Sequence, residues 1–476
     1  MVSVQRVACG RPRGGYDASD VVATCGKRLG RWLTTPRTTP WILFFVALVP
    51  RLLFVALAHP PGDYVTSDMW VYDLRATHLL RGDLGPWDSF TPAGYPAFLA
   101  VLYSIAGRQL MLVGVVQALL GASVVVLTYA LAMEVGHRRT PASLAAVVIA
   151  LHVPMVLYSG LLLSETLFSF VLILGSYLLL RSISKPSFGL ASVAGLTLGC
   201  AAVVRPNLLV VLPFVSMAAF FGFSRAKKRT ALHSLVVLAA AIVPLSAHSW
   251  HNSRLVDRWV PTSTNGGLNF YLNVAEVRSV EFREGSYTHR ITPIPNLIRY
   301  DHDERVERPF YDDRYFYAAG FRQIAEAPRR LLKGFWSLKE TFGLGRQDYW
   351  PGWPPWRVLL GVESRVFSIL VVFPGLLGLG LVFARRVPLR RAGAGWVWIA
   401  ALILGNLLAA AVYLGDPRLR VPYDPFYAIA AAVVYVEAGR RIHARRRSQS
   451  GQVRGGSGTH DNPRAALVAC ATGAAP

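Results

Sequence analysis

The chain has 476 residues, of which 53% are hydrophobic and 16% are charged. Soluble globular chains carry roughly 25% charged residues, so this composition is typical of a membrane protein and excludes a soluble enzyme, a disordered chain and a small secreted scaffold. The 50 Lys and Arg against 27 Asp and Glu give a net charge of +23. These basic residues form short clusters between apolar runs and no continuous patch interleaved with aromatic residues, so we expect no nucleic-acid partner.

Apolar runs dominate the chain, and a bilayer-spanning helix needs about 20 such residues. Ten runs come close to this length: 41–58, 109–133, 142–158, 164–180, 188–204, 206–223, 231–249, 366–384, 395–414 and 423–439. Basic clusters follow alternate runs, as the positive-inside rule requires. The sequence therefore predicts an all-α polytopic membrane protein with about 10–12 transmembrane helices and both termini in the cytoplasm. We expect its membrane to be the bacterial cytoplasmic (inner) membrane, where it would lie among the membrane lipids.

The same pattern divides the chain into five parts. We expect a disordered cytoplasmic tail over 1–40, a transmembrane core over 41–249, an exported loop domain of mixed structure over 250–365, C-terminal transmembrane helices over 366–439, and a second disordered cytoplasmic tail over 440–476. An outer loop, 59–108, interrupts the core. Its apolar stretch 93–107 is short and predicts a helix on the outer surface, although a true span remains an alternative.

This first outer loop is unusually acidic for so basic a chain. Asp68 directly follows the first span, where a carboxylate is partly desolvated and its pKa can be tuned toward that of a general base. A second carboxylate, Glu165, lies at the outer end of the fourth span, where an ionisable residue is expensive and a function is the default hypothesis. The alternative for Glu165 is a favourable charge at a helix N-terminus beside a Ser164 cap. The sequence does not decide between the two.

Three arginines are predicted at the outer membrane edge, namely Arg205, Arg418 and Arg420. A planar guanidinium at this level suits a phosphate ester whose lipid tail stays in the bilayer. The alternative is that each side chain only reaches the outer head groups.

Several segments together resemble the GT-C superfamily of polytopic glycosyltransferases, specifically family 39 and the lipid A aminoarabinose transferases that use polyprenyl-phosphate sugars. The segments are Ser67-Asp68 with Tyr72-Asp73, Thr91 to Leu99, Gln117 to Ala122, Tyr158 to Phe168, Gly195 to Pro206, Ser263 to Tyr271, and Arg418 to Pro422. Their order and their predicted membrane sidedness carry the resemblance, which covers residues 41 to about 440.

The resemblance implies an inverting transfer of a hexose or pentose from a polyprenyl-phosphate carrier to a hydroxyl or phosphate of a lipid, glycan or protein acceptor on the outer face. It implies that Asp68 is the general base, that Glu165 orients the acceptor or sugar, and that the three arginines bind the donor phosphate. It also places Tyr72, Tyr95, Asn265 and Asn269 in the substrate loops.

This sequence departs from the family pattern in two places. Met69 follows Asp68 where many relatives have a second acidic residue, so Asp73 is an alternative base. The closing turn reads Arg418-Leu419-Arg420, without the usual aromatic residue in the middle. Some relatives use a divalent metal, and Asp68, Asp73 and Glu165 could hold Mg or Mn as oxygen ligands.

Two other classes compete with the enzyme. A transporter or lipid flippase would need ionisable residues along a path through the membrane, whereas those predicted here gather at the outer edge. A non-catalytic scaffold would leave the acidic loop and the edge arginines unexplained. The sequence identifies neither the sugar nor the acceptor.

Overall fold

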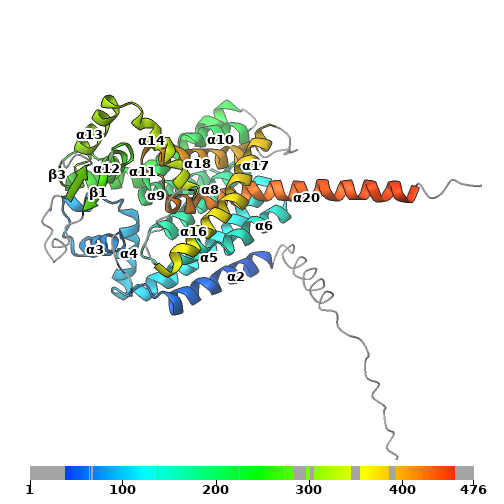
Figure 1. Cartoon of the computed structure of the whole chain (residues 1–476), viewed down its shortest axis with the longest axis horizontal. Coiled ribbons are helices and arrows are strands. Elements are labelled where there is room, and N and C mark those ends of the chain that lie inside the picture. Colours follow the sequence, from blue (N-terminus) through cyan, green and yellow to red (C-terminus); the bar gives the residue numbers. More distant parts are fainter. Residues whose placement is uncertain are drawn as a thin grey trace, which may run out of the picture.

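The computed structural model describes residues 38–63, 65, 68–136, 138–223, 226–275, 277–281, 296–300, 305–344, 354–384 and 393–455. These residues form a bundle of roughly parallel and antiparallel helices with a smaller cap at one end (Figure 1). The predicted N-terminal tail lies almost entirely outside the described residues. The all-α polytopic architecture predicted from the sequence is confirmed.

Six helical segments within the described residues are long and apolar enough to cross a membrane. They are α2 (Thr39–Leu53) continued by η1 (Phe54–Ala58), α5 (Leu110–Gly136), α8 (Glu165–Ser184), α11 (Lys227–Leu255), α16 (Pro354–Phe367) continued by η4 (Ser368–Val372) and α17 (Phe373–Phe383), and α18 (Gly393–Val412). Each coincides with one of the ten apolar runs.

The other four runs form helices that are shorter, broken or more polar than a simple span. They correspond to α6 (Arg139–Ala150) with α7 (Val153–Leu157), to α9 (Phe188–Val204), to η3 (Pro206–Val210) with α10 (Phe214–Gly222), and to α20 (Asp424–Gly455). Prolines at 154, 206 and 213 lie at three of the helix starts, because proline lacks the amide that a helix interior needs. Helix α20 continues to Gly455, so the disorder predicted from residue 440 is not seen over 440–455.

Small residues let the membrane helices approach closely. A Cβ added at Gly195 of α9 would collide with the carbonyl oxygen of Val237 in α11, and one at Gly199 would collide with that of Ala241. This four-residue spacing of glycines is a common device of membrane helix pairs, where packing replaces the hydrophobic effect. It packs α9 closely against α11, and α9 ends at Val204, directly before Arg205.

Two segments far apart in sequence form the cap. The first contains α3 (Asp68–Arg81), η2 (Pro86–Ser89) and α4 (Gly94–Ala106). The second contains α12 (Asn265–Val274), an antiparallel sheet in the order β1 (Val277–Glu281), β2 (Asn296–Tyr300), β3 (Arg305–Arg308), and then α13 (Asp313–Glu326), α14 (Arg330–Trp336) and α15 (Leu338–Thr341).

Direct contacts join the two cap segments. The backbone amide of Thr264 donates to the carbonyl of Ser89 at 3.0 Å, and the rings of Trp87 and Phe310 stack with centroids 6.0 Å apart. Figure 1 shows both segments at one end of the bundle, opposite the end from which α20 projects. The two predicted outer loops therefore lie on the same side of the molecule.

Candidate functional site

Asp68 opens helix α3 at the boundary between the cap and the bundle. Its side chain is 46% exposed, and its Oδ2 lies 2.8 Å from Nη1 of Arg418. Tyr72 is one helical turn later, on the same face, and its ring packs edge-on against Tyr95 with centroids 5.1 Å apart. Burial and the nearby charge of Asp68 raise the pKa of Tyr72 to about 12, so its hydroxyl stays protonated.

Asp73, the alternative base, points away from Asp68. Five residues correspond to about 140° around a helix, and the Asp73 carboxylate is buried in a different set of contacts. Arg108 donates to both of its oxygens, with Nη2 2.7 Å from Oδ2, and the Tyr103 hydroxyl donates to Oδ1 at 2.7 Å. These bonds tie α3 to α4 and the turn that follows it. Both lone-pair edges of Asp73 are thus occupied by structural donors.

Glu165 is the first residue of α8 and only 1% exposed. Its Oε1 lies 2.7 Å from Nη2 of Arg205 and also accepts from Nε of Arg418. Ser164 precedes it but makes no helix-capping bond, so the predicted cap role of Ser164 is wrong. The Ser164 hydroxyl instead accepts from Nε of Arg205 at 3.1 Å.

The backbone conformation of Arg205 is set by the proline that follows it. A residue before proline is pushed out of the helical region, and Arg205 ends α9 in an extended conformation with φ −142° and ψ 108°. Its guanidinium lies 5.7 Å from the centre of the Phe168 ring and contacts the same Glu165 oxygen as Arg418 does. Its Nη1 is buried without a partner in the described part of the chain.

Arg418 connects the whole cluster. It lies on the four-residue helix α19 (Pro417–Arg420), where the Asp416 side chain caps the amide of Arg418 at 2.6 Å. Although burial lowers it, the carboxylates of Glu165 and Asp68 raise the pKa of Arg418 well above its ordinary value. Ion pairs therefore link four residues of alternating charge, namely Asp68, Arg418, Glu165 and Arg205. We call these four residues the open cluster.

A cavity lies beside Glu165 of the open cluster. Gly121, Met155, Tyr158 and Val421 contribute to its walls together with Glu165. Oε2 of Glu165 is buried and has no partner among the described residues. The open cluster therefore offers a half-exposed carboxylate at one end, and an unused acceptor and an unused donor deeper in.

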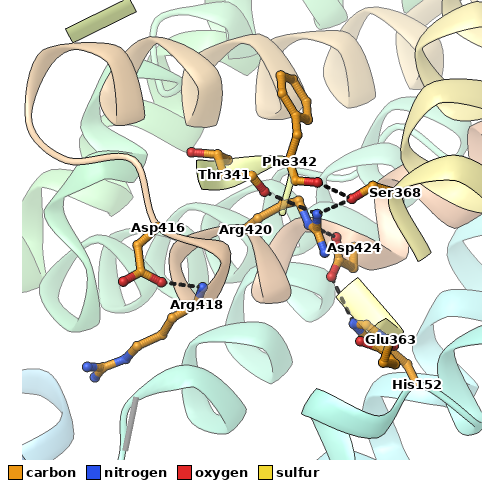
Figure 2. A network of polar contacts seen from close by, with 9 residues as sticks. All are labelled: His152, Thr341, Phe342, Glu363, Ser368, Asp416, Arg418, Arg420 and Asp424. Atoms are coloured by element: carbon orange, nitrogen blue, oxygen red, sulfur yellow. Dashed lines mark hydrogen bonds and ion pairs between the residues drawn. The ribbon is translucent and has the colours of Figure 1, made fainter. Parts of the chain in front are cut away.

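Arg420 does not join this cluster. Two residues correspond to about 200° around a helix, and Figure 2 shows Arg418 and Arg420 leaving α19 in opposite directions. Arg420 is fully buried and donates from Nε to Asp424 at 2.9 Å and from Nη1 to the Ser368 hydroxyl at 2.8 Å. The predicted assignment of Arg420 to the donor phosphate conflicts with this placement, because its guanidinium faces the interior.

The predicted substrate-loop residues are also divided. The Tyr95 hydroxyl donates to Gln117 Oε1 at 2.9 Å, and the Gln117 amide donates to the carbonyls of Ser159 and Leu161. Tyr95 thus supports the irregular segment that leads into Glu165. Asn265 and Asn269 are partly buried on α12, in the other cap segment, and Asn265 accepts from the Ser263 hydroxyl at 2.9 Å.

The hypothesis of a metal site held by Asp68, Asp73 and Glu165 does not fit this arrangement. Arg418 stands between Asp68 and Glu165, and Asp73 faces Arg108. No group of three His, Cys, Asp or Glu side chains within the described ranges could hold a metal ion.

Sequence reasoning missed several residues that build the site. Asp416 could have been found, since Asp before proline at a helix start is a typical N-cap signal. Arg108 carries no such signal, because its partner Asp73 lies far away in sequence. Gln117 opens one of the segments that carry the resemblance, but its role in supporting the Ser159 and Leu161 carbonyls appears only in the fold.

Comparison with protein families bears directly on this cluster. Residues 64–245 match the sequence model of the dolichyl-phosphate-mannose-protein mannosyltransferases. Across these residues the chain is similar to that family, which is a member of the GT-C superfamily. No curated protein matches the chain significantly. The family segment includes Asp68, Glu165 and Arg205, whereas Arg418 lies beyond it and joins the open cluster only in the folded molecule.

Proposed function

We propose that this protein is a glycosyltransferase that moves a monosaccharide from a polyprenyl-phosphate carrier to an acceptor, with the open cluster as its catalytic centre. The single observation that carries the proposal is the series of ion pairs from Asp68 to Arg418, Glu165 and Arg205. In this series the half-exposed Asp68 carboxylate contacts one of two arginines that the buried Glu165 carboxylate holds together. The similarity of residues 64–245 to the mannosyltransferase family supports the reaction class.

In the proposed reaction the acceptor hydroxyl loses its proton to the Asp68 carboxylate. The acceptor oxygen attacks the anomeric carbon, the bond from that carbon to the phosphate oxygen breaks, and polyprenyl phosphate leaves with the electron pair. A single displacement of this kind inverts the anomeric configuration. A positioned base contributes about 10²- to 10⁴-fold to such a step.

Arg418 and Arg205 supply the positive charge that the leaving phosphate needs. Negative charge develops on the departing oxygen, and preorganised donors in a site shielded from water stabilise it more than water does. Glu165 holds both guanidinium groups in place, so we assign it to orientation and not to proton transfer. Asp73 is assigned to the support of α3, because its oxygens are taken by Arg108 and Tyr103.

The proposal also concerns the orientation in the membrane. Polyprenyl-phosphate sugars present their head groups at the membrane surface, so the cap and the open cluster would face outward and the projecting end of α20 would face the cytoplasm (Figure 1). Exposed Arg440 and Arg441 near that end agree with the positive-inside rule. We infer a bacterial cytoplasmic membrane as the location.

The test uses the purified full chain in detergent with a panel of polyprenyl-phosphate hexoses and pentoses, the mannosyl donor first. Released polyprenyl phosphate is measured by mass spectrometry, and the anomeric configuration of the product by NMR. We expect turnover by the wild type, with inversion, and a loss of about 10²- to 10⁴-fold in Asp68→Asn. The matched control is Asp63→Asn, an exposed aspartate of the same loop.

Two outcomes would contradict the proposal. Wild-type rates in Asp68→Asn would remove the base from the mechanism. No release from any donor by a folded wild type would reject the transfer reaction and favour the rival hypothesis of a lipid or sugar transporter, which lipid translocation in vesicles would then test.

A further inference from the structure

A second set of charged residues lies behind the open cluster and has no part in the reaction described above. Figure 2 shows Arg420, Asp424, His152 and Glu363 linked in a continuous line through the interior. We call these four residues the closed network. The side chains of Arg420, Asp424 and His152 are fully buried.

His152 is the centre of the closed network. Its Nδ1 lies 2.7 Å from Oε1 of Glu363 and its Nε2 lies 2.9 Å from Oδ2 of Asp424. Ionised carboxylates only accept hydrogen bonds, so this geometry suits an imidazole with a proton on each ring nitrogen, which is cationic. The two positive and two negative groups then balance, which is the condition under which charges are tolerated in an interior.

Arg420 forms the other end of the line and joins separate parts of the chain. Its Nε donates to Asp424 at 2.9 Å, while its Nη1 donates to the carbonyl of Thr341 at 3.1 Å and to the Ser368 hydroxyl at 2.8 Å. One guanidinium thus holds α15, η4 and α20 together. The Phe367 ring stacks on His152 with centroids 4.0 Å apart and lies 5.4 Å from the Arg420 guanidinium.

Helix α19 depends on these contacts. A helix of four residues is not stable without contacts to the rest of the fold, since a single helical turn is unstable in isolation. Its start is fixed by the Asp416 cap and its end by Arg420. Arg418 lies between these two points, so its position relative to Asp68 and Glu165 follows from how firmly both ends are held.

We propose that Arg420, Asp424 and His152 are positioning residues that hold the α19 turn so that Arg418 can bridge Asp68 and Glu165. This inference rests on the proposed function for its effect on turnover, and on the geometry alone for its effect on α19. Loosening the closed network shifts Arg418 and separates the base from the cations at the leaving group. A displacement of about 1 Å in a catalytic arrangement can reduce the rate by about 100-fold.

The main test is a double-mutant cycle between the closed network and Arg418. Arg420→Lys keeps the charge but replaces the planar fork by a single ammonium group, which cannot reproduce all three contacts. We expect kcat/KM for the donor to fall about 100-fold. In an Arg418→Ala background the same substitution should cost less than about twofold, because the residue being positioned is absent.

A second readout does not depend on activity. Hydrogen exchange of residues 416–423 should become faster in Arg420→Lys, while exchange in α5 and α8 should be unchanged. The matched control is Tyr435→Phe, which removes a 2.6 Å bond from α20 to the carbonyl of Leu370 in η4 without touching the closed network. It should leave both turnover and exchange of residues 416–423 as in the wild type.

A paired substitution covers the case in which Arg420→Lys does not fold. The double variant R420M with D424N removes one positive and one negative charge together, and the new amide oxygen can still accept from His152. Removing both charges of a buried pair is less destabilising than removing one and leaving the other unpaired, and the same loss of turnover and faster exchange are expected.

The outcomes separate the two proposals. Equal losses of kcat/KM in both backgrounds, or unchanged exchange of residues 416–423, would overturn the positioning role even if the wild type transfers sugar. A wild type without transferase activity would overturn the proposed function, and the exchange measurement would still decide whether the closed network holds α19.

Discussion

The open cluster and the closed network use the same kinds of side chain and share one short helix, yet they differ in access. In the open cluster, the Asp68 side chain is 46% exposed. In the closed network, Asp424 accepts from His152 and Arg420 at once, and its side chain is fully buried. Buried charges that pair with one another hold a structure together, whereas a charged side chain that is open to solvent can meet a ligand.

The largest expected difference between the two regions is in stability. Asp424→Leu leaves Arg420 and His152 buried without their shared counter-charge, and we expect the free energy of unfolding to fall by about 3–5 kcal/mol. Asp68→Leu should change it by less than about 1 kcal/mol, because Arg418 keeps Glu165 and the lost pair is half exposed. Thermal unfolding in detergent measures both. Equal losses would show that the open cluster is as structural as the closed network.

The next effect concerns turnover through Arg418. Arg418→Lys keeps the positive charge but cannot bridge Asp68 and Glu165 with a planar fork. We expect kcat/KM for the donor to fall by about 10²- to 10³-fold, as when one preorganised donor is removed from an anionic transition state. The control is Arg314→Lys, at an exposed arginine of α13. A fall no larger than in this control would separate Arg418 from the site.

A smaller effect distinguishes the two aspartates of α3. Asp73→Asn weakens the bonds to Arg108 and Tyr103, and we expect a loss of about 1–3 kcal/mol in unfolding free energy with turnover retained. Asp83→Asn, at an exposed position just after the same helix, should be neutral. If Asp73→Asn instead abolished turnover in a folded protein, Asp73 would replace Asp68 as the base.

The smallest effect tests the support beneath Glu165. Tyr95→Phe removes the hydroxyl that donates to Gln117, and we expect a loss of about 1 kcal/mol. Combining it with Gln117→Leu would also remove the bonds to Ser159 and Leu161. The double variant should therefore lower turnover, whereas Tyr95→Phe alone should not. The thermal midpoint and the donor turnover of both variants check this order.

Much of the architecture could be predicted because hydropathy is a local property. The runs 41–58, 109–133 and 164–180 correspond closely to α2 with η1, to α5 and to α8. The runs 142–158 and 206–223 are predicted as single spans and are instead broken near their prolines, whereas 231–249 keeps Pro244 inside one continuous helix, α11. Whether a proline bends a helix or ends it depends on which neighbours satisfy the freed backbone groups, and sequence periodicity does not contain that information.

The candidate site was predictable residue by residue but not as an arrangement. Asp68, Glu165, Arg205 and Arg418 were each singled out because a charge at a predicted membrane edge is costly. Sequence spacing alone does not separate Asp68 from Asp73 or Arg418 from Arg420. In each pair helical geometry turns the two side chains to different faces, and only the packed neighbours decide which face carries the cluster.

The amino-acid sequence by itself determined that the chain spans a membrane, where most of its helices lie, and which charged residues stand at their ends, because these follow from composition and from spacing along the chain. The tertiary structure alone decided that Arg418, from the last quarter of the chain, lies between Asp68 and Glu165, while Arg420 turns inward to Asp424 and His152. The physical reason is that pairing between distant charges depends on how α3, α8, α19 and α20 pack, and this is set by contacts of the whole fold.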